Sequence, residues 1–151
     1  MSGIRLGGID DIRSINELGY ELLEQSVSAG IPLDDKKFRM LVASLIAIKL
    51  GNVWVVVDDD DKPQGFLLGL VEDLFYSRQR YATDLAVYVR DGYRHLAPRL
   101  FREFIKWAKS KPRVVQITLG LASGIGDPDR VGRMYEKLGL FRVGGIYSVR
   151  V

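Results

Sequence analysis

The chain has 151 residues, of which 47% are hydrophobic and 27% are charged, and its net charge is +3. This length predicts one folded domain spanning residues 1–151, and the composition excludes a disordered chain. No apolar run is long enough to span a membrane, and the absence of cysteine excludes disulfides, thiolate metal sites and a cysteine nucleophile. The first residues lack the apolar run of a secretory signal, so we expect a cytoplasmic protein.

The charged residues indicate which ligands to expect. The positive excess is modest and acidic residues are spread through the chain, so we do not expect a nucleic-acid partner. The charge is compatible with a phosphate-rich ligand. Four consecutive aspartates at 58–61 could suggest a metal, but carboxylates on an exposed turn are usually solvated, and we expect no metal site.

One short strand and two helices are predicted in the first third of the chain. The strand covers 4–6, and Asp10 or Asp11 can cap the helix that follows it. Asp34 offers a second cap, for a helix whose apolar period continues up to the stop at Gly51. Two helices therefore precede the main sheet.

Three strands are predicted next. The segments 53–57 and 65–74 are rich in apolar and β-branched residues and are separated by a polar turn, which indicates a hairpin. A polar connection at 76–81 leads to a third strand at 82–89. These strands should form the centre of the sheet.

The last third of the chain alternates helix and strand. Pro98 can open a helix that runs to about Lys109, and a strand is expected at 114–119. Asp127 can cap a final helix, and 141–151 should supply one or two terminal strands. The element order predicts an α+β domain.

The last predicted helix carries the most informative segment, 134–140, which reads Met-Tyr-Glu-Lys-Leu-Gly-Leu. Val131, Met134, Tyr135 and Leu138 follow the spacing of an amphipathic helix, so packing on a sheet is one explanation of this segment. The segment also resembles the Leu/Met-Tyr-x-x-x-Gly-Phe/Leu motif of the GNAT N-acetyltransferases. In that family the tyrosine hydroxyl lies beside the thioester sulfur of acetyl-CoA.

The resemblance extends over nearly the full chain. Residues 84–89 resemble the family's fourth strand, 104–109 the end of its central helix, and 119–125 its fifth strand and the loop that follows. Small acetyltransferase-like proteins of bacteria and bacteriophages are similar by pattern. The resemblance implies a GNAT-like acyl-CoA N-acyltransferase fold, in which about four helices flank a central mixed, mostly antiparallel sheet.

The resemblance implies transfer of an acetyl group from acetyl-CoA, as co-substrate, to a primary amine by direct attack. Tyr135 would protonate the departing thiolate. Asp84 is the first candidate for the base that deprotonates the amine, and Glu72 or Asp73 on the neighbouring strand could serve instead. The family also binds the thioester through strand amides, which here lie near Val87 and Val89.

The pyrophosphate of acetyl-CoA is expected at 94–99, where a strand gives way to a helix amino terminus. The family pattern there is Arg or Gln, two residues, Gly, one residue, then Gly or Ala. With Arg94 in the leading position, no other residue of 94–99 matches the pattern. A count back from Trp107 instead places Gly92 at the leading position, His95 at the first glycine and Ala97 at the last small residue. Because glycine lets the backbone approach a pyrophosphate closely, either Arg94, His95 and Arg99 compensate with side-chain contacts or the site has been lost.

A second hypothesis follows from this departure. The chain could be a catalytically inactive binding or regulatory protein that keeps the fold and engages a protein or nucleic-acid partner through its basic residues. Those residues are Arg94, Arg99, Arg102, Lys106 and Lys109. In the first hypothesis the acceptor is a small-molecule or protein amine, and a homodimer built through the terminal strands is compatible with both.

Overall fold

A computed structural model describes residues 2–121 and 123–151 of the chain. The strands are β1 (Gly3–Leu6), β2 (Gly51–Val57), β3 (Pro63–Asp73), β4 (Arg80–Val89) and β5 (Val114–Thr118). The α-helices are α1 (Ile12–Gln25), α2 (Asp35–Ala47), α3 (Ala97–Lys109) and α4 (Pro128–Lys137), and two short 3₁₀ helices are η1 (Ile9–Asp11) and η2 (Arg94–Leu96). This is the predicted order up to the end of α4.

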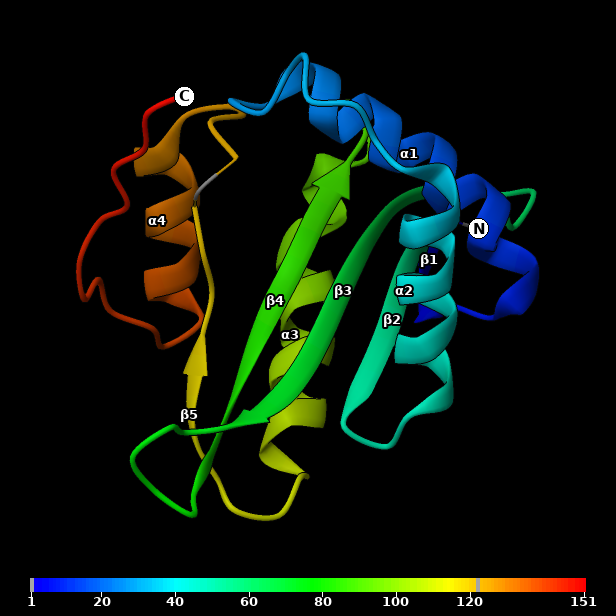
Figure 1. Ribbon diagram of the computed structural model, residues 1–151. Coiled ribbons are helices and arrows are strands. Elements are labelled where there is room, and N and C mark those ends of the chain that lie inside the picture. The colour runs from blue at the N-terminus through cyan, green and yellow to red at the C-terminus, as the bar shows by residue number, and fades with distance from the viewer. Residues whose placement is uncertain (1, 122) are drawn as a thin grey trace.

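The five strands form one sheet in the order β1-β2-β3-β4-β5. Neighbouring strands are antiparallel from β1 to β4, whereas β4 and β5 are parallel. Figure 1 shows α1 and α2 on one face of the sheet, α3 on the other, and α4 beside β5. The predicted α+β fold with a mixed, mostly antiparallel sheet is confirmed.

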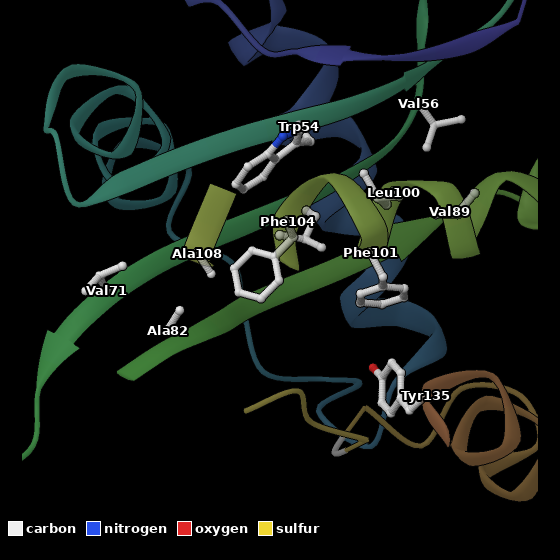
Figure 2. Packing of buried hydrophobic residues seen from close by; sticks show 11 residues of the cluster. Trp54, Val56, Val71, Ala82, Val89, Leu100, Phe101, Phe104, Ala108 and Tyr135 are labelled. Atoms are coloured by element: carbon white, nitrogen blue, oxygen red, sulfur yellow. The ribbon is translucent and has the colours of Figure 1, made fainter. Parts of the chain in front are cut away.

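The core is divided by the sheet into two clusters. On the α1 and α2 face, Ile15 and Val42 pack against Phe66 and Tyr88. On the other face, α3 and α4 pack on the sheet through a cluster that is rich in aromatic side chains, as Figure 2 shows. Alternate side chains of each strand point to opposite faces, so both faces of the central strands are apolar and buried.

Aromatic rings organise the second cluster. Phe104 meets the edge of Trp54 at a centroid distance of 5.7 Å, and Phe101 meets Tyr135 at 5.2 Å in a similar edge-to-face arrangement. Such contacts stabilise by about 0.5–1.5 kcal/mol beyond the burial of apolar area. The ring of Tyr135 is therefore part of the core, as its helical spacing predicted.

The predicted helix caps are confirmed in two of three cases. Asp34 accepts a hydrogen bond from the Lys37 amide, and Asp127 accepts one from the Asp129 amide. Asp11 occupies the cap position of α1 but makes no capping bond there. Its carboxylate is instead held by two guanidinium contacts from Arg5, at 2.8 and 3.0 Å.

The predicted terminal strands are wrong. Residues 141–151 are exposed and form no strand, and Figure 1 shows them passing outside α4, away from the sheet. The end of the chain is fixed by Arg150, which donates to the carbonyl oxygens of Val27 and Ala29 at 2.9 and 3.0 Å. The alternation of apolar residues is typical of a segment that could pair in a sheet. A strand also needs a neighbouring strand to complete its backbone hydrogen bonds, and the alternation alone does not provide one.

Gly69 tests the packing between the sheet and α3. A Cβ atom at Gly69 would lie 2.8 Å from the Phe104 ring and 3.1 Å from the Trp54 ring. We expect Gly69→Ala to lower the free energy of unfolding by about 1–3 kcal/mol, because both rings would have to move. Urea denaturation measures this. Gly3→Ala is the control because nothing lies within 4 Å of its Cβ position; equal losses in the two variants would contradict the packing described.

Candidate active site

The sheet opens between β4 and β5. The two strands pair from Arg80–Val114 to Thr83–Thr118, whereas β4 continues to Val89 alongside β3 alone. Within the described residues, no part of β4 beyond Thr83 pairs with β5. A gap in the hydrogen-bond ladder therefore lies beside the carboxyl-terminal half of β4.

The amides of Val87 and Val89 face this gap. The amide of Arg90 donates to Gln64 of β3 at 2.9 Å, and the direction of the hydrogen bonds in an antiparallel pair alternates along each strand. The amides of Val87 and Val89 therefore point away from β3. The Val89 carbonyl oxygen also points away, because it accepts a bond of 3.3 Å from Arg94 Nε.

A β-bulge stands where the gap begins. Ala86 pairs with Leu68 and Asp84 pairs with Gly69, so Leu85 is an extra residue in β4. A bulge bends its strand and increases the local twist, which turns β4 away from β5. The polar, apolar and β-branched pattern of this segment predicted a strand but carried no sign of the bulge.

Asp84 and Tyr135 meet at Gly120. Asp84 Oδ1 accepts a hydrogen bond of 3.1 Å from the Gly120 amide, and the Tyr135 hydroxyl donates one of 3.0 Å to the Gly120 carbonyl oxygen. The two residues predicted to carry acid and base chemistry are thus brought together by the loop after β5. Gly120 itself was not predicted, because its contribution is made by backbone atoms alone.

Burial sets the protonation of both groups. Desolvation raises the pKa of the Asp84 carboxyl above its ordinary value, because burial penalises the charged form. Desolvation also raises the pKa of the Tyr135 hydroxyl, and the neighbouring Asp84 carboxylate raises it further. Asp84 is therefore a better proton acceptor than an exposed aspartate, and Tyr135 keeps its proton at neutral pH.

The other predicted bases lie elsewhere. Glu72 accepts a hydrogen bond of 2.7 Å from the Tyr81 hydroxyl, and Asp73 forms an ion pair of 3.0 Å with Arg80. Both pairs stand where β4 starts, before the bulge and the gap. Of the three predicted candidates, Asp84 is the one that shares a contact residue with Tyr135.

The loop after β4 makes a tight turn before α3. The Tyr93 amide donates to the Arg90 carbonyl oxygen at 3.1 Å, and Gly92 has a φ of +91°, a conformation that favours glycine. The short helix η2 then leads into α3 at Ala97, where Pro98 occupies the first turn as predicted.

Arg90 anchors the start of this loop, which the sequence did not reveal. Its guanidinium contacts the Glu21 carboxylate of α1, with a shortest distance of 2.6 Å, and donates to Gln64 Oε1 at 2.9 Å. The Arg90 guanidinium lowers the pKa of the Glu21 carboxyl. Because its guanidinium is paired with the Glu21 carboxylate and with Gln64, Arg90 positions the loop.

The remaining predicted residues surround the amino terminus of α3. Arg94 and Arg99 are exposed, and Ala97 is half-buried in the first turn. His95 lines a surface depression together with three carboxylates of the β2–β3 turn, Asp58, Asp59 and Asp60. These carboxylates would repel a phosphate, whereas the exposed guanidinium groups of Arg94 and Arg99 would attract one.

Within residues 2–121 and 123–151, no group of three or more His, Cys, Asp or Glu side chains could hold a metal ion. No helix within the same residues is long and apolar enough to cross a bilayer.

Solved structures resemble the whole chain. A possible acetyltransferase from Clostridium difficile 630 matches with a TM-score of 0.71 and 20% identity, covering 100% of this chain and 98% of that one. The fold is that of the GNAT-type acetyltransferases. A ribosomal-protein-alanine N-acetyltransferase from Brucella melitensis biovar Abortus 2308 matches with a TM-score of 0.68 and 17% identity, covering 99% of both chains. An aminoglycoside acetyltransferase from an uncultured soil metagenomic sample matches with a TM-score of 0.70 and 13% identity, covering 100% of this chain and 99% of that one.

At these identities the likeness establishes the fold alone. No family model matches the sequence, and no curated protein matches it either. The α+β fold with its mixed, mostly antiparallel sheet matches these acetyltransferase structures.

The raised pKa of Asp84 predicts a pH-dependent stability. The folded protein binds a proton at Asp84 more tightly than the unfolded chain does, so its free energy of unfolding falls as pH rises from the ordinary aspartate range through the raised value. An Asp84→Asn variant can still accept the Gly120 bond but cannot ionise.

We therefore expect the stability of Asp84→Asn, relative to the unmodified protein, to be greater at pH 7 than at pH 4. Chemical denaturation at both pH values measures this difference. Asp10→Asn serves as a control for the same change at an exposed site. A relative stability that stays constant with pH would show that Asp84 is not desolvated.

Proposed function

We propose that the protein is an acetyl-CoA-dependent N-acetyltransferase that acts on a primary amine by direct attack. The observation that carries the proposal is the convergence of Asp84 and Tyr135 on Gly120, beside a strand whose amides at Val87 and Val89 have no β5 partner. The likeness of the fold to acetyltransferase structures supports it. We further propose that the protein acts in the cytoplasm.

The chain's own residues supply the groups that the reaction needs. Bound acetyl-CoA would contribute a reactive thioester. The amides of Val87 and Val89 are directed so that they can bind its carbonyl oxygen, which gains negative charge during attack. Asp84 accepts the proton lost by the amine, directly or through a water, and Tyr135 donates its hydroxyl proton to the departing thiolate.

The pyrophosphate is assigned to the side chains of Arg94 and Arg99 beside Ala97, because the Ala97 amide already donates to the Arg94 carbonyl oxygen and Pro98 has no amide hydrogen. Two exposed guanidinium groups can form charge-assisted bonds to phosphate, which compensates for the missing glycines of the family loop. His95 remains a second, weaker candidate because carboxylates stand beside it. Arg90 and Arg94 hold the two ends of the loop to α1 and to Val89, so the loop is fixed before the ligand arrives.

The acceptor is proposed to be a small-molecule or protein amine, and a homodimer is compatible with the exposed terminal segment. A second candidate function is a catalytically inactive protein that binds a protein or nucleic acid. The exposed basic residues along α3, Arg102, Lys106 and Lys109, favour it. This second function predicts a salt-sensitive association that survives Tyr135→Phe, with no binding of acetyl-CoA.

Tyr135→Phe tests the proposed proton donor. Removing the hydroxyl should lower kcat by about 100-fold or more, the usual contribution of a general acid, while the Kd for acetyl-CoA stays within about twofold. Thiol release measures kcat, and calorimetry measures Kd. Tyr147→Phe is the control because its side chain is 96% exposed. An unchanged kcat in the Tyr135 variant would rule out its role as the acid.

The double variant Arg94→Gln, Arg99→Gln tests the phosphate site. Losing two charge-assisted contacts should weaken acetyl-CoA binding by about 100-fold or more, because each such bond contributes about 1.5–3 kcal/mol and 1.4 kcal/mol is about tenfold in Kd. Isothermal calorimetry at fixed ionic strength gives the Kd. Arg13→Gln removes one positive charge at a side chain on α1 that is 84% exposed, and this control should bind normally. Equal affinities in all three proteins would place the phosphates elsewhere.

A further inference from the structure

Helix α1 holds β4 at the two residues that flank Val89. The Tyr88 hydroxyl donates to Glu21 Oε2 at 3.1 Å, and the Arg90 guanidinium donates to both oxygens of the same carboxylate, with a shortest distance of 2.6 Å. Residues two apart in a strand point to the same face, which allows both side chains to reach α1. One carboxylate of α1 therefore contacts β4 immediately before and immediately after Val89.

A second side chain of α1 completes the contact with Tyr88. Gln25 lies one helical turn after Glu21, and its Nε2 donates to the Tyr88 hydroxyl oxygen at 2.8 Å. The hydroxyl both accepts and donates a hydrogen bond, and Tyr88 is only 5% exposed. A buried hydroxyl with both bonds made has one preferred position, so the Tyr88 side chain fixes this part of β4 against α1.

These contacts act on the peptide unit that carries the Val89 amide. The Tyr88 carbonyl group and the Val89 amide belong to one planar, rigid unit. On one side this unit is held by the pairing of Tyr88 with Phe66 of β3, and its amide points away from β3. In the part of the chain that the structure describes, β5 pairs with β4 only as far as Thr83, so β5 does not restrain the tilt of this unit. The contacts from α1 supply a restraint in its place.

The Glu21–Arg90 pair differs from an ordinary surface ion pair. Its side chains are 33% and 31% exposed, and Arg90 also donates to Gln64 Oε1 at 2.9 Å. The Arg13–Glu17 pair, one turn earlier on α1, is 3.8 Å long and its side chains are 84% and 55% exposed. A guanidinium that contacts both carboxylate oxygens fixes geometry, whereas a long exposed pair does not. Glu17 is therefore a matched control for Glu21.

We propose that Glu21 is a positioning residue, which sets the direction of the Val89 amide in the gap through Tyr88 and Arg90. This inference rests on the proposed function and adds a residue of α1 to it. An amide stabilises the charge that develops on the thioester oxygen only when it is aimed at that oxygen. Loss of the Glu21 contacts should therefore weaken this donor without removing it.

Amide NMR tests the direction of the Val89 amide without turnover. Protein labelled with ¹⁵N-valine is saturated with acetyl-CoA and, in parallel, with CoA, and the additional shift caused by the acetyl group is measured. In Glu21→Gln, which keeps the size of the side chain but loses its charge, this additional shift at Val89 should fall by about half or more. The shift at Val87 should change less, because the Glu21 contacts flank Val89.

Two variants accompany this measurement. Tyr88→Phe removes one of the two contacts and should reduce the additional Val89 shift in the same direction. Glu17→Gln makes the same chemical change on α1 and should leave that shift as it is in the unmodified protein. Because the resonances of folded molecules are measured, a variant that is partly unfolded does not imitate the expected result.

Kinetics test the consequence for catalysis. Glu21→Gln should lower kcat by about tenfold or more, which is less than the loss of a whole oxyanion donor, while KM for acetyl-CoA stays within about twofold. Glu17→Gln should keep both constants. A kcat in Glu21→Gln equal to that of the unmodified protein, or an unchanged additional shift at Val89, would overturn the inference.

The two measurements separate this inference from the proposed function. An additional Val89 shift that depends on Glu21, without acetyl transfer by the unmodified protein, would support the positioning and overturn the proposed reaction. Acetyl transfer that Glu21→Gln leaves unchanged would overturn the inference and leave the acetyltransferase standing. A protein that does not bind acetyl-CoA would overturn both.

Discussion

The site depends on the end of pairing between β4 and β5. Up to Thr83 and Thr118 the two strands share a ladder, and beyond that point the bulge at Leu85 turns β4 away. The Gly120 amide donates to the Asp84 side chain and not to the backbone of a strand. The loop after β5 therefore lies against β4 at the point where the pairing of the two strands ends. The Tyr135 hydroxyl, from α4, donates to the same loop, which brings the proposed acid and the proposed base together at Gly120.

Helix α1 is connected to the proposed phosphate loop through side chains. Arg90 donates hydrogen bonds to Glu21 and to Gln64, and Gln64 donates to Asp58 at 2.7 Å. Tyr88 joins this network by donating to Glu21 at 3.1 Å. Helix α1, the β2–β3 turn and the loop after β4 are therefore fixed to one another by side-chain contacts.

Sequence reasoning predicted features that depend on local chemistry. Asp34 and Asp127 cap helices because their carboxylates satisfy free amides within the next turn, which spacing alone reveals. The Leu85 bulge and the role of Gly120 depend on contacts between segments far apart in the sequence, so no local pattern carries them. The prediction of terminal strands was wrong for a related reason, because the alternation of apolar residues at 141–151 does not show which strand they could pair with.

The central claim is that the gap beside β4 receives the acyl group of acetyl-CoA. Amide NMR of protein labelled with ¹⁵N-valine tests it directly, with acetyl-CoA compared against CoA. We predict that the Val87 and Val89 amide resonances shift with acetyl-CoA more than with CoA, whereas those of Val53 and Val55, buried in β2, do not. Saturable acetyl-CoA binding that leaves Val87 and Val89 unshifted, or no binding at millimolar ligand, would contradict it.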